Sequence, residues 1–211
     1  MDKAKLAGQY VKLLKPLYAK PQCALEYRDP LQLLVATILS AQCTDERVNK
    51  VTPALFKKYR TAKDLASADV AELEGLVRST GFYHNKAKSI IEASRAIAEK
   101  FGGKVPDNME DLLSLRGVAR KTANVVLSSA YGKSEGVVVD THVKRIAFRM
   151  GLTDNTEPEK IERDLMELLP HSQWMWWSYA IVLHGRALCM ARKPNCAGCP
   201  ANKVCPKRGV A

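Results

Sequence analysis

Apolar residues recur at intervals of three and four along almost the whole chain, and this period limits the fold more than any other feature. Such spacing is typical of amphipathic helices that bury one face. The first stripe is formed by Leu6, Tyr10, Leu13, Leu14 and Leu17. The only strand-like run is Val137 to Val139, and one isolated triplet makes no sheet. The sequence therefore predicts an all-α fold.

Start signals and apolar stripes divide the chain into successive helices. Asp29 and Pro30 supply an N-cap and an N1 proline, and either Thr44 or Asp45 can cap the next helix. After the N-terminal stripe we expect helices at 31–42, from about 45, and at 68–78, 85–100, 109–113, 119–131, 141–150, 157–169 and 172–188. From Cys189 onward, prolines and the lack of an apolar period predict an irregular segment.

The chain is strongly basic, with 33 Lys and Arg against 22 Asp and Glu and a formal net charge of +11. A positive surface favours a polyanion, most simply nucleic acid, although the excess charge also serves solubility alone. No run approaches the roughly 18 apolar residues that a membrane helix needs, and lysines interrupt the start where a secretory signal is apolar. We therefore expect a cytoplasmic protein without a membrane partner, associated with the nucleoid if the source is bacterial.

Four of the six cysteines, Cys189, Cys196, Cys199 and Cys205, follow the spacing C-x6-C-x2-C-x5-C. Disulfides are disfavoured in a cytosolic chain, so clustered thiolates indicate a metal centre. Zinc and an iron–sulfur cluster both stay open, and four ligands in one short segment favour the cluster. The metal would replace the core that this segment lacks. Arg192 and Lys193 lie between the first two cysteines, where they face a phosphate backbone or offset the charge of the cluster.

A tight turn, Leu115-Arg116-Gly117-Val118, joins two predicted helices in the segment 111–128. Glycine permits a positive φ, and the amides at the start of the second helix can bind an anion. Two helices joined in this way can grip a DNA phosphate through main-chain N–H groups, whatever the base sequence. The alternative is a simple connector between helices.

Lys121 falls in the first turn of the second helix, where a cation opposes the helix dipole. Asp140 follows the apolar run Val137 to Val139 and begins another helix. As a pair, Lys121 and Asp140 suggest an amine nucleophile and an assisting carboxylate, and attack on carbon requires the uncharged amine. The structural alternatives are a phosphate contact for the lysine and an N-cap for the aspartate.

Taken together, these motifs resemble the endonuclease III family of helix-hairpin-helix DNA glycosylases. The matching segments cover most of the chain: Leu39 to Asp45, GFYHNKA from Gly81, LRGVARKTANVVL at the turn, VDTHV from Val139, LHGR from Leu183, and the four cysteines. The resemblance implies two helical domains that flank a DNA-binding cleft. One is a six-helix domain with the helix-hairpin-helix at 22–133, and the other is a 4Fe-4S cluster domain built from 1–21 and 134–211.

The resemblance also implies a bifunctional DNA glycosylase and abasic-site lyase of base excision repair that removes oxidised pyrimidines. Lys121 would attack C1′ and form a Schiff base before β-elimination, and Asp140 would assist proton transfer. Cys189, Cys196, Cys199 and Cys205 would hold the cluster. The implied partner of a monomer is duplex DNA with oxidised pyrimidines or abasic sites, contacted by Gln42, Phe82, Arg116, Gly117, Val118, Ala119, Arg120, Arg192 and Lys193.

Three positions depart from the family pattern: Arg116 replaces a proline, Ala119 replaces a glycine, and Phe82 stands where a smaller aliphatic residue is expected. We expect DNA binding with altered affinity. The related adenine-mismatch glycosylases lack the lysine nucleophile and need an acidic residue within 36–42, which this chain does not have. A DNA-binding module without catalysis and a zinc-stabilised structural protein stay open as alternatives.

Overall fold

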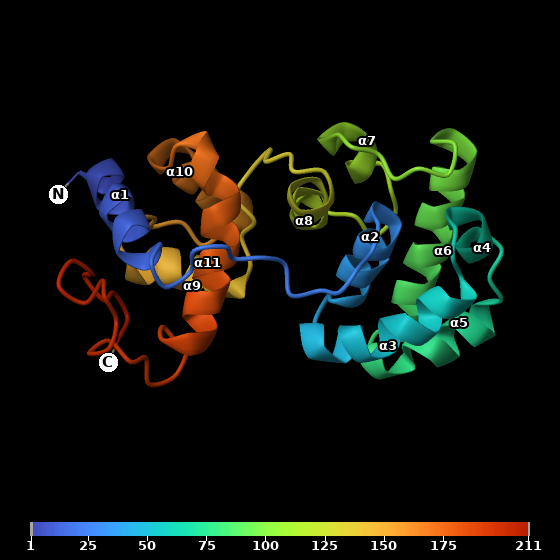
Figure 1. The fold of residues 1–211 in the computed structure, drawn as a ribbon, viewed down its shortest axis with the longest axis horizontal. Helices are drawn as coiled ribbons and strands as arrows, with labels where there is room; N and C mark the ends of the chain where they lie inside the picture. Colours follow the sequence, from blue (N-terminus) through green and yellow to red (C-terminus); the bar gives the residue numbers. More distant parts are fainter. Residues whose placement is uncertain (1, 211) are drawn as a thin grey trace. The chain divides into compact units, whose positions relative to one another are not determined.

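The computed structural model describes residues 2–210, and every regular element within them is a helix (Figure 1). The α-helices are α1 (Lys3–Leu14), α2 (Pro30–Leu39), α3 (Asp45–Lys58), α4 (Ala62–Ala66), α5 (Val70–Val77), α6 (Tyr83–Lys100), α7 (Met109–Leu113), α8 (Arg120–Ala130), α9 (Thr141–Arg149), α10 (Pro158–Leu168) and α11 (Trp174–Ala187). Two short 3-10 helices are η1 (Arg78–Thr80) and η2 (His171–Gln173). The predicted all-α fold is confirmed.

The helix boundaries follow the capping signals closely. Asp29 accepts a hydrogen bond from the backbone N–H of Gln32 at 2.9 Å, and Pro30 begins α2 as predicted. Thr44 rather than Asp45 caps α3. Helix α2 ends at Leu39, before the predicted boundary at Gln42, and a turn follows. The pattern did not predict α4, because five residues are too few to show a helical period.

The chain divides into two compact units. The central unit runs from Cys23 to Lys133, and the terminal unit combines the residues up to Gln22 with those from Ser134 onward. No helix within residues 2–210 is both long and apolar enough to cross a membrane.

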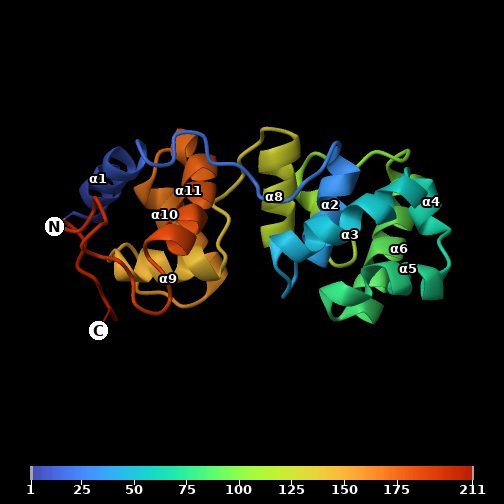
Figure 2. The same ribbon diagram turned by 60° about the horizontal axis from the view of Figure 1, so that its bottom comes forward.

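In the central unit, α2 is the buried helix that its unbroken apolar run predicts. Every residue from Leu33 to Leu39 is buried, and α2 packs against α8, α3 and α6 (Figure 2). The longest helix, α6, packs against α4 and α5 and turns a second face toward α2. Helices α6 and α8 therefore both pack against α2.

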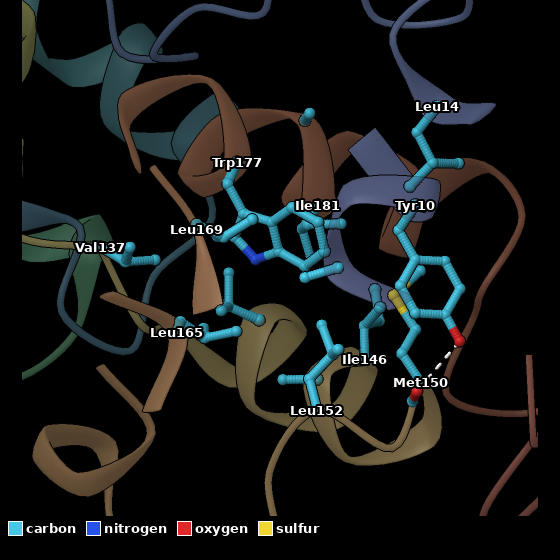
Figure 3. Close-up of a cluster of buried hydrophobic side chains, with 14 of the residues drawn as sticks. Tyr10, Leu14, Val137, Ile146, Met150, Leu152, Leu165, Leu169, Trp177 and Ile181 are labelled. Carbon is cyan, nitrogen blue, oxygen red and sulfur yellow. Dashed lines mark hydrogen bonds between the residues drawn. The ribbon is translucent and has the colours of Figure 1, made fainter. Parts of the chain in front are cut away.

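In the terminal unit, α9, α10 and α11 surround a core around the fully buried Trp177 (Figure 3). Helix α1 joins this core through Tyr10, whose hydroxyl donates to the carbonyl of Met150 at 3.0 Å. Residues 188–210, here called the tail, contain no helix, as predicted. The tail rests on the core through Ala201, Val204 and three of its cysteines, Cys189, Cys199 and Cys205.

Candidate functional site

The turn between α7 and α8 requires glycine at position 117 for two reasons. Gly117 has φ +77°, a conformation that L-residues rarely adopt. A Cβ built there would lie 2.7 Å from the Cβ of Ser89 on α6 and 2.9 Å from its Oγ. The side chain of Val118 is buried and anchors the turn, and the backbone N–H of Val118 donates to the carbonyl of Leu115. The hairpin therefore lies closely against α6.

Lys121 is exposed in the first turn of α8. The N-cap residue of this helix is Ala119, which provides no capping side chain, and the first turn contains no acidic residue. The partial positive charge at the helix start can therefore attract an anion. Cys23 lies close enough for the two groups to interact: burial raises the pKa of the Cys23 thiol, and the positive charge of Lys121 partly opposes this.

Arg116, at the tip of the turn, is held by an ion pair. Its Nη1 lies 3.0 Å from Oε2 of Glu92 on α6, and about half of the Arg116 side chain is exposed. The ion pair ties the turn to α6 and partly neutralises the cation.

Three of the predicted DNA contacts, Gln42, Phe82 and Gly117, line one pocket of about 240 Å³ in the central unit. Gln42 has φ +53° and Phe82 has φ +49°, so both adopt the left-handed backbone conformation that is uncommon for residues other than glycine. Phe82 is 64% exposed despite its large apolar ring. Strained, exposed residues beside a pocket are typical of functional positions.

Lys86 also lines this pocket, and the sequence analysis did not single it out. Its side chain is only 5% exposed, and its Nζ donates to the carbonyls of Leu39 and Thr80, each at 2.8 Å. Burial lowers the pKa of this lysine. A lysine on an otherwise apolar helix face was its only signal in the sequence, and one of its two acceptors, Leu39, lies 47 residues away along the chain.

Asp140 belongs to the terminal unit and is the N-cap of α9. One carboxylate oxygen, Oδ1, accepts a hydrogen bond from the N–H of Val143 at 2.8 Å. The preceding residues, Val137 to Val139, are buried and form no strand within the described chain. The capping role that the sequence allowed is therefore present, and it uses only one of the two carboxylate oxygens.

The four clustered cysteines surround a small cavity of about 30 Å³ in the terminal unit. Among residues 2–210, no three side chains of the Cys, His, Asp and Glu types gather closely enough to hold one metal ion. Burial raises the pKa of the Cys199 and Cys205 thiols. His184 faces Cys199, with Nε2 3.7 Å from Sγ, and burial lowers the pKa of His184 to about 4. The imidazole is therefore neutral at pH 7.

Arginines on α9 attach the start of the tail to the core. Arg149 donates to the carbonyls of Met190 and Ala191 at 2.7 Å and 2.9 Å, and its Nη1 lies 3.5 Å from Sγ of Cys189. Arg145 donates to the carbonyl of Cys189 at 3.0 Å. The next residues, Arg192 and Lys193, are exposed. The sequence did not reveal these anchors, because they lie some forty residues from the carbonyls that they bind.

Comparison with known proteins gives a consistent result. Residues 35–171 match the family model of the HhH-GPD superfamily of base excision DNA repair proteins. The endonuclease III of Synechocystis sp. is 57% identical over 205 residues, which cover 97% of this chain and 94% of that protein.

Two solved structures are also similar to this chain, each at 38% identity. A non-covalent endonuclease III–DNA complex has a TM-score of 0.92 and covers 98% of this chain and 96% of its own. A trapped covalent endonuclease III–DNA intermediate with an estranged adenine has a TM-score of 0.91, with coverages of 98% and 97%.

Proposed function

The chain belongs to the endonuclease III family of HhH-GPD base excision DNA repair proteins, and we propose that Lys121 and Asp140 carry out its DNA glycosylase and abasic-site lyase chemistry. Its substrates are oxidised pyrimidines and abasic sites in duplex DNA. The observation that carries the proposal is an exposed lysine in the first turn of α8, directly after a glycine turn suited to phosphate.

Lys121 acts as the nucleophile. Its uncharged Nζ attacks C1′ of the damaged nucleotide, the bond from C1′ to the base breaks, and the base leaves with the bonding electrons. The C1′–O4′ bond of this adduct then breaks as a proton passes to O4′, and the C1′–N bond becomes the double bond of a Schiff base. The Schiff base acidifies the C2′ proton, whose removal expels the 3′ phosphate by β-elimination. Water then hydrolyses the imine and releases Lys121. The partial positive charge at the start of α8 attracts the anionic DNA backbone to this lysine.

Asp140 assists these steps through the carboxylate oxygen that the cap does not use. The hydrogen bond from Val143 fixes the orientation of the carboxylate, so Oδ2 has a defined direction. A carboxylate held in this way stabilises the positive charge that develops on the sugar and accepts or returns a proton. The cap and the catalytic role are compatible, because they use different oxygens.

The hairpin binds the DNA backbone, and the pocket residues enter the duplex. The N–H groups of Gly117 to Arg120 and the cation of Arg116 suit phosphate oxygens, which hold a protein on DNA without reading its sequence. Gln42 and Phe82 suit the space that an extruded nucleotide leaves, since they stand exposed around one pocket. Arg192 and Lys193 add cations from the tail. The protein acts as a monomer in this proposal.

The four cysteines suit a 4Fe-4S cluster. All four line one cavity in the terminal unit, and such a cluster is held by four Cys thiolates. The Arg149 guanidinium beside Cys189 helps to offset the negative charge of four thiolates. When bound, the cluster contributes thiolate–iron bonds that hold the tail in place and takes no part in the reaction at the sugar.

Borohydride trapping tests the proposal, because reduction turns the Schiff base into a stable protein–DNA adduct. With a duplex that contains thymine glycol or an abasic site, we expect an adduct from the wild-type protein and none from Lys121→Ala. Lys104→Ala, an exposed lysine in the same unit, serves as the control and should keep the adduct. An adduct of undiminished yield from Lys121→Ala would overturn the assignment.

Asp140→Asn separates the two roles of the aspartate. Asparagine is a good N-cap, so we expect α9 and the affinity for damaged DNA to be kept while single-turnover rates fall by about 100-fold. Equal losses of affinity and rate would show that the residue only caps the helix.

A further inference from the structure

Lys86 is a buried cation whose acceptors are two main-chain carbonyls rather than a carboxylate. Burying an ammonium costs several kcal/mol unless strong hydrogen bonds compensate. Lys86 makes two such bonds, both of 2.8 Å, to Leu39 and Thr80. These bonds link three segments of the central unit: the end of α2, the end of η1 and the first turns of α6.

Both acceptors lie at helix ends, where carbonyls lack partners within the helix. Leu39 is the last residue of α2, and Thr80 is the last residue of η1. The C-terminal ends of helices carry partial negative charge, and a cation there forms charge-assisted hydrogen bonds that are stronger than neutral ones. An apolar side chain at position 86 would leave two buried carbonyls without this donor.

The two segments that Lys86 joins lead directly to Gln42 and Phe82. The turn after Leu39 reaches Gln42, and the turn after Thr80 reaches Phe82 through Gly81. Both residues have left-handed backbones, and both line the pocket that also contains Lys86. Such conformations cost free energy and persist only where neighbouring contacts hold them.

We propose that Lys86 is a positioning residue that holds Gln42 and Phe82 in the arrangement with which they enter the duplex when the damaged nucleotide is extruded. This inference rests on the proposed function. Extruding a stacked nucleotide costs a few kcal/mol, and residues that are already ordered lose less entropy when they fill the space. Lys86 therefore matters most for lesions that are still paired and stacked.

Lys86→Met tests this role, since methionine keeps much of the side-chain volume and removes the charge. The control is Lys88→Met, which removes an exposed lysine from the same helix. Two substrates are compared: thymine glycol paired with adenine in a duplex, and thymine glycol in a single-nucleotide bulge, where it is less well stacked. Single-turnover rates and the half-saturating protein concentrations are measured for both.

We expect Lys86→Met to lower the rate on the paired lesion at least tenfold and the rate on the bulged lesion by no more than about twofold. Lys88→Met should match the wild type on both. Equal losses on the two substrates, or no loss on either, would overturn the inference. If the melting temperature of Lys86→Met is well below that of the wild type, Lys86→Gln is used in its place, because its amide keeps a hydrogen-bond donor. The expected and contradicting rates stay the same.

A double-mutant cycle adds a readout that general destabilisation does not produce. If Lys86 acts through Gln42 and Phe82, adding Lys86→Met to a protein that already carries Gln42→Ala and Phe82→Ala should hardly lower the single-turnover rate on the paired lesion any further. Full additivity would contradict the inference. Borohydride trapping with the bulged lesion distinguishes failure of this inference from failure of the proposed function. If the wild-type protein forms no adduct, the proposed function is contradicted. If Lys86→Met forms the adduct, its Lys121 chemistry is intact, and a lower rate on the paired lesion has another cause.

Discussion

The hairpin between α7 and α8 and the tail after α11 both expose cations, but they keep their shapes by different means. The hairpin depends on its backbone: Gly117 has the required φ and lies directly against Ser89 of α6. The tail has no helix and depends on side chains from elsewhere, above all Arg149, and on its four cysteines. A short turn between packed helices keeps its conformation through its own backbone and the helices beside it. An irregular segment needs hydrogen-bond donors from other parts of the chain and, in our proposal, a metal cluster.

Cys199→Ser should cause the largest difference in stability between the tail and the hairpin. Loss of a proposed ligand removes metal-binding free energy, so we expect iron content to fall and the melting temperature to drop by about 10 °C or more. Hydrogen exchange should increase first in the tail and much less in the hairpin. Cys23→Ser, which changes a cysteine outside the cluster, should leave the iron content unchanged. Full iron content in Cys199→Ser would remove this residue from the ligand set.

Gly117→Ala should destabilise the hairpin and leave the structure of the tail unchanged. The positive φ costs an L-residue about 1–2 kcal/mol, and crowding against Ser89 adds about as much, so we expect a loss of about 3 kcal/mol in the free energy of unfolding. Gly132→Ala is the matched control, because its φ is +66° but nothing lies within 4 Å of the added Cβ. Denaturant titration gives the loss in the free energy of unfolding for each variant, and the difference between the two losses is the cost of crowding against Ser89. Equal losses would show that Ser89 moves aside freely.

Arg149→Met should loosen the start of the tail without affecting the hairpin. It removes charged hydrogen bonds to Met190 and Ala191, which we expect to cost about 2 kcal/mol and to speed proteolysis within the tail. Release of iron to a chelator should accelerate as well. Arg163→Met, on the exposed face of α10, should behave like the wild type. Unchanged proteolysis in Arg149→Met would show that the cysteines alone hold the tail.

Glu92→Gln should have the smallest effect, and it acts on the hairpin through charge. An exposed ion pair contributes less than about 1 kcal/mol, so stability should hardly change. Freeing Arg116 should raise the affinity for undamaged duplex DNA about two- to threefold at low salt, and added salt should remove the gain. Glu99→Gln removes the same charge from an exposed position on α6. Equal gains in both variants would assign the effect to net charge alone.

Local features were readable from the sequence wherever neighbouring residues decide the structure. The Asp29-Pro30 start of α2, a cap for α3 at Thr44 or Asp45 and the positive φ of Gly117 depend on interactions within a few residues. The spacing of the cysteines likewise marked the tail as a segment held by something other than an apolar core. For the same reason, periodicity alone was sufficient to predict the all-α fold.

Contacts between distant segments could not be read in this way. Lys86 binds the carbonyl of Leu39, and Arg149 binds that of Met190, and no local pattern identifies such partners. The gathering of Gln42, Phe82 and Gly117 around one pocket also depends on how α2, α6 and the hairpin pack. The sequence by itself determined most of the helices, several of their caps and the candidate chemistry, because these depend on short-range interactions. Only the tertiary structure decided which buried cations hold the functional turns, because main-chain carbonyls are alike in sequence and differ only in where packing places them.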